Sequence, residues 1–539
     1  MFHRNSLMIL AALTAAKMAA QAAPGEPDLS FGGTGRVAVA PPTGGGSAYA
    51  LAIQGDGKVV AVGDSGSGNG DFAVMRLLEG GGADPNFGSS GWVTAGVGSF
   101  DSAAGVAIQP DGKIVVAGCG LVNGDTRQLV AMRFMEGGGL DPDFGDGGRA
   151  VFGPPERFNE HVLGMAIDGK GRIVLVGSGR DGVLVARLTT GGQPDSGFGS
   201  QGIVQTEVAR PQAEGRAVAI QPDGRIVVAG VHRLADNRTA PLVLRYLENG
   251  GLDLEFGTGG MVRIDSPGAL NSLVVMGDGG LLSGGDAVGD FLVIRLLARG
   301  SFDPLFGSGG FTTLDASGQD RIAGLAVTGI GKIIFAGEST QGGRSYAFTG
   351  RLRSNGGLDT AFGGGGATYS QFGAEDRFRA VALTTDGRTV VAGSSRGTDG
   401  ITRFALARHL ADTSLHPLES WRLSRFGSAA NRGTSADTAD PDGDGVPNLL
   451  EYAFGLDPLS AASRSLPSPA FTNGSLAVTL KVPDPAKGVL IGVQGSQSLT
   501  TNSWEFLEGA AVGTDQRFAL PAGQPLGWMR LMVVMNPDF

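Results

Sequence analysis

Short apolar runs separated by glycine-rich turns recur along this chain of 539 residues. The runs are rich in valine, isoleucine, leucine and alanine, and their shortness and β-branched content are typical of strands. Two runs flank a Pro-Asp-Gly turn in residues 106–118 (VAIQPDGKIVVAG) and again in residues 217–230. This pattern predicts a hairpin, because proline presets φ, aspartate favours the turn and glycine takes the positive-φ position. A strand such as residues 72–77 (FAVMRL) follows each hairpin, and a further strand such as residues 91–97 completes the unit.

Each unit also contains a motif that is best seen in residues 140–148, LDPDFGDGG. Its phenylalanine recurs at positions 31, 87, 144, 198, 256, 306 and 362, with a period of 50 to 58 residues. A fixed period of this size indicates a solenoid or a propeller. Four strands per period, without a convincing amphipathic helix, favour a β-propeller. The hairpin and the strand after it each occur seven times, so the predicted fold is all-β, a seven-bladed β-propeller.

The strand count also predicts how the ring closes. The chain opens with an unpartnered fourth strand, residues 35–40, and its last unit ends after three strands. An N-terminal strand that completes the last blade would remove free sheet edges. In six units an arginine of the repeated strand is followed eight residues later by an aspartate, whereas Arg408 is followed by His416. We therefore expect Asp28, the aspartate of the first motif, to pair with Arg408.

The three repeated pieces, LDPxFGxxG, AxAIQPDGKIVVAG and FALxRL, resemble the delta-sixty repeat of bacterial exported proteins. The resemblance covers residues 27–416, and the fifth repeat departs from it most, with VVMGDGGLLSGG in residues 274–285. It implies a β-propeller repeat to which no activity is assigned.

Composition and charge exclude several classes of protein. The net charge is −10 and no basic track is present, so nucleic acid is not an expected partner. The single cysteine, Cys119, excludes an internal disulfide framework. Residues 1–22 have the pattern of a Sec-type signal peptide, with Arg4 before an apolar stretch and a small-residue exit at Ala20-Gln21-Ala22. We expect a secreted or envelope-associated monomer without a transmembrane segment in the mature chain.

The strongest chemical signal is DPDGDGVPNLLE, residues 440–451. A twelve-residue calcium loop supplies oxygens at positions 1, 3, 5, 7, 9 and 12, with glycine at position 6. The predicted ligands are therefore Asp440, Asp442, Asp444, the carbonyl of Val446, Asn448 and Glu451. Pro447 removes an N–H that paired EF-hands use, and the loop resembles the unpaired loops of dockerins and thrombospondin type 3 repeats. The alternative is an acidic, solvated linker.

The remaining segments complete the predicted organisation. A short helix is expected in residues 418–433, before the loop, and a second helix after it, with Leu450, Ala453 and Phe454 on one face. Apolar runs after residue 465 predict strands of a small sandwich. The predicted parts are the signal peptide (1–22), the propeller (23–412), a helix and EF-hand-like calcium-loop connector (413–464) and a C-terminal β domain (465–539).

No catalytic constellation is evident in the sequence. GSSRG (393–397) and GDSGS (63–67) match serine-nucleophile patterns, but both follow a propeller strand and lead into a loop. The predicted function is an exported, non-catalytic binding or scaffold protein with a structural calcium site and an unknown ligand, such as a glycan or an envelope protein. The alternatives are a propeller hydrolase or lyase that acts on an extracellular polysaccharide, and a surface adhesin.

Overall fold

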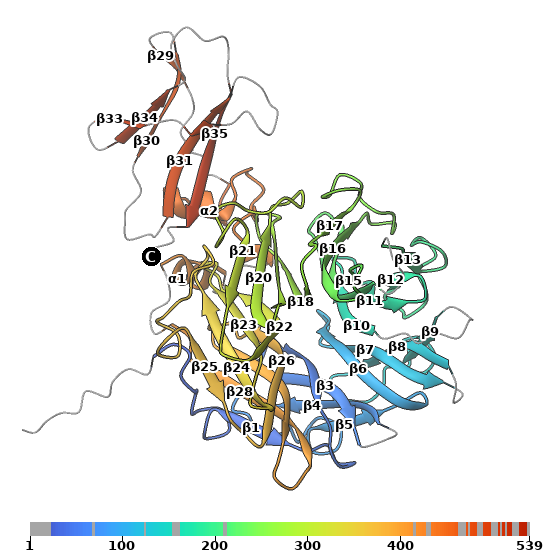
Figure 1. Cartoon of the computed structure of the whole chain (residues 1–539). Coiled ribbons are helices and arrows are strands. Elements are labelled where there is room, and N and C mark those ends of the chain that lie inside the picture. The colour runs from blue at the N-terminus through green and yellow to red at the C-terminus, as the bar shows by residue number, and fades with distance from the viewer. Residues whose placement is uncertain are drawn as a thin grey trace, which may run out of the picture.

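Seven sheets of four antiparallel strands surround a central axis, which confirms the predicted seven-bladed propeller (Figure 1). The computed structural model describes residues 23–66, 70–122, 126–153, 162–208, 213–412, 417–426, 433–461, 470–472, 475–481, 489–496, 505–506, 509–512, 515–519 and 528–535. The predicted signal peptide lies outside these residues. Within them, the helices are too short and too polar for a bilayer crossing.

Each blade is a meander whose first strand is innermost. Blades 1 to 3 contain β2 (Ala48–Ile53), β3 (Val59–Ser65), β4 (Asp71–Leu77) and β5 (Trp92–Ala95); β6 (Ser99–Ile108), β7 (Ile114–Val122), β8 (Thr126–Phe134) and β9 (Arg149–Phe152); β10 (Val162–Ile167), β11 (Ile173–Gly179), β12 (Gly182–Leu188) and β13 (Ile203–Thr206). Blades 4 and 5 contain β14 (Glu214–Ile220), β15 (Ile226–Arg233), β16 (Thr239–Tyr246) and β17 (Met261–Arg263); β18 (Gly268–Val275), β19 (Leu281–Ala287), β20 (Asp290–Leu296) and β21 (Phe311–Leu314). Blades 6 and 7 contain β22 (Gln319–Val327), β23 (Ile333–Gln341), β24 (Arg344–Leu352) and β25 (Ala367–Ser370); β26 (Glu375–Leu383), β27 (Thr389–Arg396), β28 (Thr402–His409) and β1 (Arg36–Val39).

The N-terminal strand closes the ring as predicted. β1 pairs with β28 in antiparallel register, from Arg36 opposite Ala407 to Val39 opposite Phe404. An isolated bridge between Pro27 and His409 extends this pairing. The seventh blade is therefore built from both ends of the propeller sequence, and its outer edge is the first strand of the chain.

An arginine and an aspartate pin the outer half of every blade. Their Nε to Oδ2 distances are 2.8 Å (Arg76–Asp84), 2.6 Å (Arg133–Asp141), 2.8 Å (Arg187–Asp195), 2.8 Å (Arg245–Asp253), 3.0 Å (Arg295–Asp303), 2.7 Å (Arg351–Asp359) and 2.7 Å (Arg408–Asp28). Six of these arginines also donate Nη1 to a backbone carbonyl of the next blade, as Arg133 does to Thr190 at 2.7 Å. The pair therefore joins neighbouring blades as well as two strands of one blade.

The repeated phenylalanines fill the space between blades. Phe31 packs among residues of blades 7 and 1, and Phe87 among residues of blades 1 and 2. Six of the seven rings also lie under the guanidinium of their own blade's arginine, at 4.5 to 4.9 Å from centroid to Cζ. These six rings thus combine apolar burial with a cation–π contact.

The two faces of the propeller carry different connections. The Pro-Asp-Gly hairpins and the LDPxFGxxG turns lie on one face, which we call the turn face. The connections between second and third strands, and those between blades, lie on the opposite variable-loop face, because strands of a meander alternate in direction.

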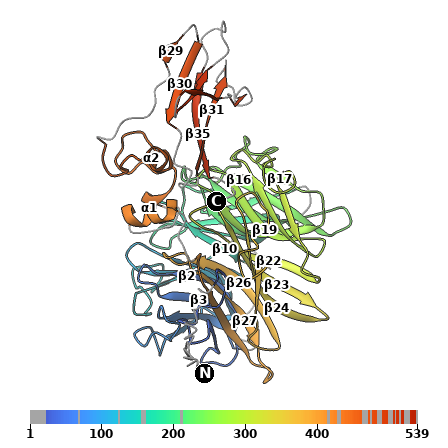
Figure 2. The same ribbon diagram turned by 90° about the vertical axis from the view of Figure 1, so that its left-hand side faces the viewer.

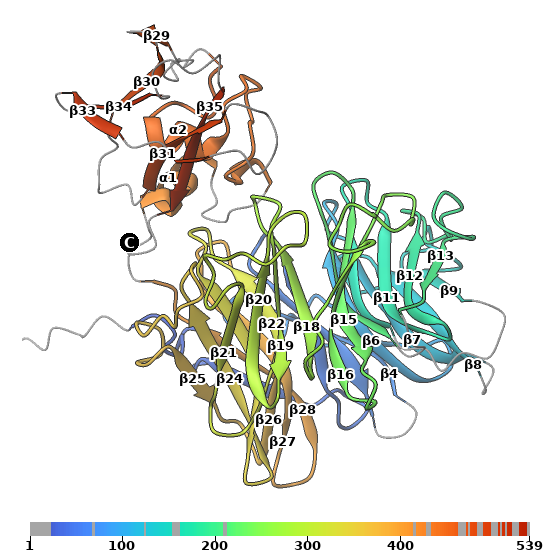
Figure 3. The same ribbon diagram turned by 45° about the horizontal axis from the view of Figure 1, so that its top comes forward.

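The connector and the C-terminal strands follow the last blade and project from the ring (Figures 2 and 3). The connector contains α1 (Pro417–Phe426), the 3-10 turn η1 (Gly433–Ser435) and α2 (Asn448–Phe454), which ends at Gly455 with φ of 72°. Two small sheets follow, with strand orders β29-β30-β34-β33 and β32-β31-β35. Their strands are β29 (Ala470–Thr472), β30 (Ser475–Lys481), β31 (Val489–Ser496), β32 (Glu505–Phe506), β33 (Gly509–Val512), β34 (Asp515–Ala519) and β35 (Trp528–Met535).

Candidate functional site

The connector loop before α2 gathers three carboxylates. One oxygen each of Asp440, Asp442 and Asp444 lies within 4.8 Å of the others. Backbone amides hold the loop in shape: Asp440 accepts bonds from Gly443 at 3.0 Å and from Gly445 at 2.8 Å. The two ends of the loop are tied by a bond of 2.9 Å from the N–H of Asn448 to the carbonyl of Ala439. The sequence therefore folds locally so that alternate side chains face a common centre.

Five oxygens of the predicted ligands are buried without a hydrogen-bond partner. They are Asp442 Oδ2, Asp444 Oδ2, Asn448 Oδ1 and both carboxylate oxygens of Glu451. Glu451 is fully buried, and Asn448 donates both of its amide hydrogens to carbonyls of residues 434 and 436, at 2.8 and 2.7 Å. Buried polar atoms are normally paired because desolvation without a partner costs roughly 1–3 kcal/mol each. This donor set, all oxygen and mostly anionic, fits a hard divalent cation.

The mutual repulsion of the carboxylates in the loop also favours a bound cation. Burial raises the pKa of Glu451, and the charges of Asp442, Asp444 and Asp440 raise it further, to about 7. Carboxylates that are close and poorly solvated disfavour one another's ionised form. Val446, the predicted carbonyl ligand, is buried in the loop between Asp444 and Asn448. All six predicted residues thus lie in one loop and the helix turn that follows it.

The connector is attached to the turn face of the propeller. Arg422 of α1 is fully buried and donates Nη1 to the carbonyl of Gly329, at 2.5 Å, in the hairpin turn of blade 6. Its Nη2 bonds to Asp437, which lies just before the acidic loop. Arg422 therefore contacts both the ring and the segment that leads into the loop.

A second candidate site lies in the central channel, on the variable-loop face. Every innermost strand has a β-bulge near its start, and the additional residue stands at the same repeat position in each blade. We call these residues the bulge ring: Tyr49, Ala104, Leu163, Arg216, Asn271, Ala323 and Arg379. All seven line one cavity of about 570 Å³. Bulges re-aim side chains, and here they direct one variable side chain per blade into the channel.

Positive charge is concentrated on one side of this ring. Asn271 Oδ1 accepts bonds of 3.0 Å from Arg216 Nη1 and from Arg321 Nη2, and Arg321 lines the same cavity. Burial lowers the pKa of Arg321, and the neighbouring Arg379 and Arg216 lower it further. The Nε of Arg321 is buried without a hydrogen-bond partner. Three of the four arginines that line the cavity thus lie together. Arg216 is paired with Glu214 at 3.1 Å and Arg379 with Glu338 at 3.5 Å. An anion in the cavity would reduce the remaining repulsion between the guanidinium groups.

Two of the three carboxylates that line the cavity accept backbone N–H groups, and the third, Glu214, pairs with Arg216 at 3.1 Å. Burial raises the pKa of Asp64, but its Oδ1 accepts the N–H of Ser47 at 2.8 Å. Burial also raises the pKa of Asp101, whose Oδ2 accepts the N–H of Val97 at 2.7 Å. Both groups therefore cap loops between blades.

The two serine motifs occupy strand hairpins. Ser394 and Ser395 of GSSRG lie within β27 opposite Phe404 and Arg403, and Ser395 is buried. Residues 63–65 of GDSGS belong to β3, and Ser67 lies outside the described residues. The strand-turn-helix that exposes a nucleophile does not occur at either described segment.

The bulge ring was not predicted from the sequence. The signal that could have found the ring is the one variable position inside an otherwise uniform first strand, four residues before its last apolar residue.

Five segments of the chain match the family model described as "Domain of unknown function (DUF5122) beta-propeller": residues 54–87, 109–144, 221–256, 331–362 and 384–415. Each begins at the hairpin turn between the first and second strands of a blade. No curated protein matches the sequence.

Solved structures that are similar include virginiamycin B lyase from Staphylococcus aureus with Quinupristin, in a catalytically inactive form, at 12% identity, with 69% of this chain and 98% of that chain covered and a TM-score of 0.39. A protein of unknown function from Dyadobacter fermentans has 13% identity, coverage of 70% and 98%, and a TM-score of 0.39. The Nup133 β-propeller domain of Vanderwaltozyma polyspora has 10% identity, coverage of 69% and 97%, and a TM-score of 0.36. The activity in the first description belongs to that protein.

Proposed function

The repeats of this chain belong to the DUF5122 β-propeller family, and we propose that the chain is an exported, non-catalytic binding protein of the bacterial envelope or exterior. Its ligand carries an anionic group and enters the channel at the bulge ring. An acidic glycan or an acidic segment of an envelope protein has this chemistry.

The observation that carries the proposal is the bulge ring. The repeat keeps its core residues from blade to blade, yet it varies the one side chain that points into the channel. Variable residues on a rigid scaffold are the usual arrangement of a binding site. Arg216, Arg321 and Arg379 supply donors for a carboxylate, while Tyr49 and Leu163 supply apolar surface for the rest of the ligand.

An array of glycans and envelope proteins, probed with residues 23–539, tests this function. We expect acidic ligands to bind, and binding to weaken at high salt because exposed parts of the contact are screened. The double variant Arg216→Ala, Arg379→Ala should lose at least tenfold in affinity. Arg238→Ala, which removes an exposed arginine of a variable loop, is the matched control. Equal binding by both variants, or a preference for neutral ligands, would contradict the proposal.

We also propose that the connector loop holds a structural calcium ion. Asp440, Asp442, Asp444, the carbonyl of Val446, Asn448 and Glu451 would be its ligands, as expected from the sequence. The five buried oxygens without partners support this assignment. The ion would neutralise the loop and order the connector, and Arg422 would pass that order to the turn face of the ring.

The connector contacts the turn face, whereas the bulge ring opens on the variable-loop face. The C-terminal strands are then available for attachment or sorting while the ring binds.

Calorimetric titration of residues 23–539 with calcium tests the connector site. We expect Glu451→Gln to remove one binding event from the titration, and Asp111→Asn, at an exposed turn of blade 2, to leave that event unchanged. An equal heat in Glu451→Gln would contradict the assigned ligands.

A further inference from the structure

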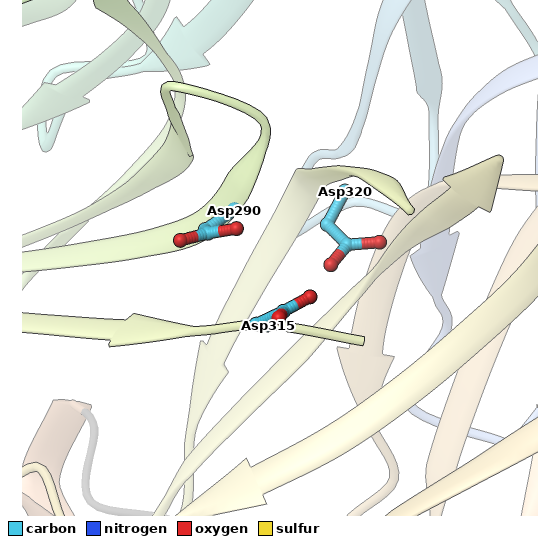
Figure 4. Close-up of side chains that lie close together, drawn as sticks. All are labelled: Asp290, Asp315 and Asp320. Atoms are coloured by element: carbon cyan, nitrogen blue, oxygen red, sulfur yellow. The ribbon is translucent and has the colours of Figure 1, made fainter. Parts of the chain in front are cut away.

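A second group of three carboxylates meets where blades 5 and 6 join (Figure 4). Asp290 begins β20 of blade 5, Asp315 follows β21 of that blade, and Asp320 lies in β22 of blade 6. One oxygen from each lies within 4.8 Å of the others. In the part of the chain that the structure describes, no lysine, arginine or histidine forms a salt bridge with any of them. Three negative charges are therefore held together without a protein cation.

Solvent cannot screen the repulsion between Asp320 and the other two carboxylates. Its side chain is directed toward the other two carboxylates, and the residue is only 2% exposed. Its Oδ2 accepts the N–H of Ala316 at 2.6 Å, but its Oδ1 is buried without any hydrogen-bond partner. A buried, half-satisfied carboxylate beside two others calls for a cation as its remaining partner.

The joint between blades 1 and 2 shows what is special about this group. There Asp71 and Asp101 occupy the same positions as Asp290 and Asp320, since Asp101 accepts the N–H of Val97 as Asp320 accepts that of Ala316. Asp101 Oδ1, like Asp320 Oδ1, is buried without a hydrogen-bond partner, so the two joints differ in the third carboxylate. The position of Asp315 is taken by Gly96. A Cβ on Gly96 would lie 2.3 Å from Asp71 Oδ1 and 2.6 Å from Asp101 Oδ2. A side chain at this position thus points into the carboxylate pair, and at blade 5 that side chain is a third carboxylate.

We propose that Asp290, Asp315 and Asp320 bind a divalent cation of the calcium class. Calcium takes oxygen ligands at about 2.4 Å, so oxygens on one ion are at most about 5 Å apart. The observed spacing lets one ion contact all three residues. Asp315 is exposed, and water can complete the coordination from that side.

The ion would join blades 5 and 6, whose other connection, made by Arg295, is long compared with the arginine bonds between the other blades. Arg295 Nη1 donates to the carbonyl of Ser354 in blade 6 at 3.2 Å, the longest of the six arginine bonds between blades described above, and the arginine side chain is 19% exposed. The other six arginines lie over a phenylalanine ring, and such a contact is not found for Arg295 among the described residues. A cation on the variable-loop face would compensate for this weaker contact on the turn face.

The test uses residues 23–539 with the connector loop disabled by Asp442→Asn and Glu451→Gln, so that its outcome is independent of the connector site. Terbium luminescence and equilibrium dialysis with calcium report binding. We expect one ion per chain, an affinity at least tenfold lower after Asp315→Asn, and no change after Asp71→Asn at the two-carboxylate joint. Asp290→Asn provides a second variant if Asp315→Asn perturbs the fold, which circular dichroism would show.

Hydrogen exchange provides a readout without changing these side chains. Calcium should slow exchange of the amides in residues 286–290 and 315–320 of the loop-disabled chain. No bound ion in that chain, unchanged affinity in Asp315→Asn, or unchanged exchange in these segments would overturn the proposal.

Discussion

Asp28 accepts a hydrogen bond of 2.7 Å from Arg408 Nε, across 380 positions of sequence. Both residues are buried, and Arg408 also donates to the hydroxyl of Ser30 at 2.8 Å and to the carbonyl of Glu79 in blade 1. The same guanidinium therefore contacts the N-terminal segment, blade 7 and blade 1. This one residue holds together the three parts that closure of the ring requires.

Asp28→Asn should destabilise the ring by about 3–5 kcal/mol, because it leaves the buried charge of Arg408 without its counter-ion. Urea unfolding of residues 23–539 measures this loss. Asp303→Asn is the matched control: it breaks the corresponding pair of blade 5, whose arginine is 19% exposed and can be partly solvated. We expect the control to lose less than half as much. Equal losses would mean that closure adds nothing beyond an ordinary pair.

Acid should weaken the same joint through His409, the last residue of β28. His409 is fully buried, its ring lies 3.5 Å from the hydroxyl of Thr349, and burial lowers its pKa to about 4. An unfolded histidine takes up a proton below about pH 6.5, whereas the folded one stays neutral to about pH 4. The free energy of unfolding should therefore fall by about 3 kcal/mol as pH decreases from 7 to 4.

His409→Gln separates this effect from the titration of carboxylates. The variant cannot gain a proton at this position, so its free energy of unfolding should vary less between pH 6.5 and 4.5. Thermal unfolding at a series of pH values measures the difference. Parallel pH profiles for the two chains would contradict the assignment to His409.

The closure could be predicted from sequence because it depends on counting. Each arginine precedes its aspartate by eight residues, so the missing aspartate after Arg408 and the surplus Asp28 identify each other. His416, which stands in the aspartate position, lies outside the described residues. This spacing can be read from the sequence because both partners belong to one repeated hairpin.

The second helix of the connector shows where such counting fails. Its apolar face was expected to contain Leu450 with Ala453 and Phe454, but Leu449 packs in the cluster with Ala453 and Phe454. α2 has only seven residues, which is too short for its apolar periodicity to define one face. The calcium-ligand spacing itself stays a prediction.

Calcium binding should change the fluorescence of Trp421. This ring lies 5.4 Å from the ring of Tyr452, which follows Glu451 in α2. Coordination of Glu451 would draw the first turn of α2 toward the loop and alter the packing of Tyr452 on Trp421. Titration of residues 23–539 with calcium, followed by tryptophan emission, measures this. The response should disappear in Trp421→Phe and persist in Trp92→Phe, which removes a ring between blades 7 and 1. A response that survives Trp421→Phe would place the change elsewhere.

The bulge ring depends on tertiary packing, and the glycine of the VVAG motif is a second, indirect signal of it in the sequence. At Gly63, Gly118, Gly230, Gly285, Gly337 and Gly393 a Cβ would lie 1.8 or 1.9 Å from a backbone carbonyl of the innermost strand. These glycines therefore let the bulged strand approach its neighbour. The VVAG glycine recurs because the bulge recurs. The reason for the glycine can be seen only when the positions of both strands are known.

Gly230→Ala should weaken ligand binding without removing any ligand-binding side chain. The new Cβ would lie 1.9 Å from the carbonyl of Glu214, so β14 must move and carry Arg216 with it. Such overpacking costs about 1–3 kcal/mol, which thermal unfolding can measure. Gly137→Ala is the control, since a Cβ at this turn position meets no atom within 4 Å, and it should leave both stability and binding nearly unchanged. Affinity for the acidic ligand found on the array should fall in Gly230→Ala alone. If the two variants bind equally, the bulge does not position Arg216. The main structural argument for a binding site at the channel mouth would then be lost.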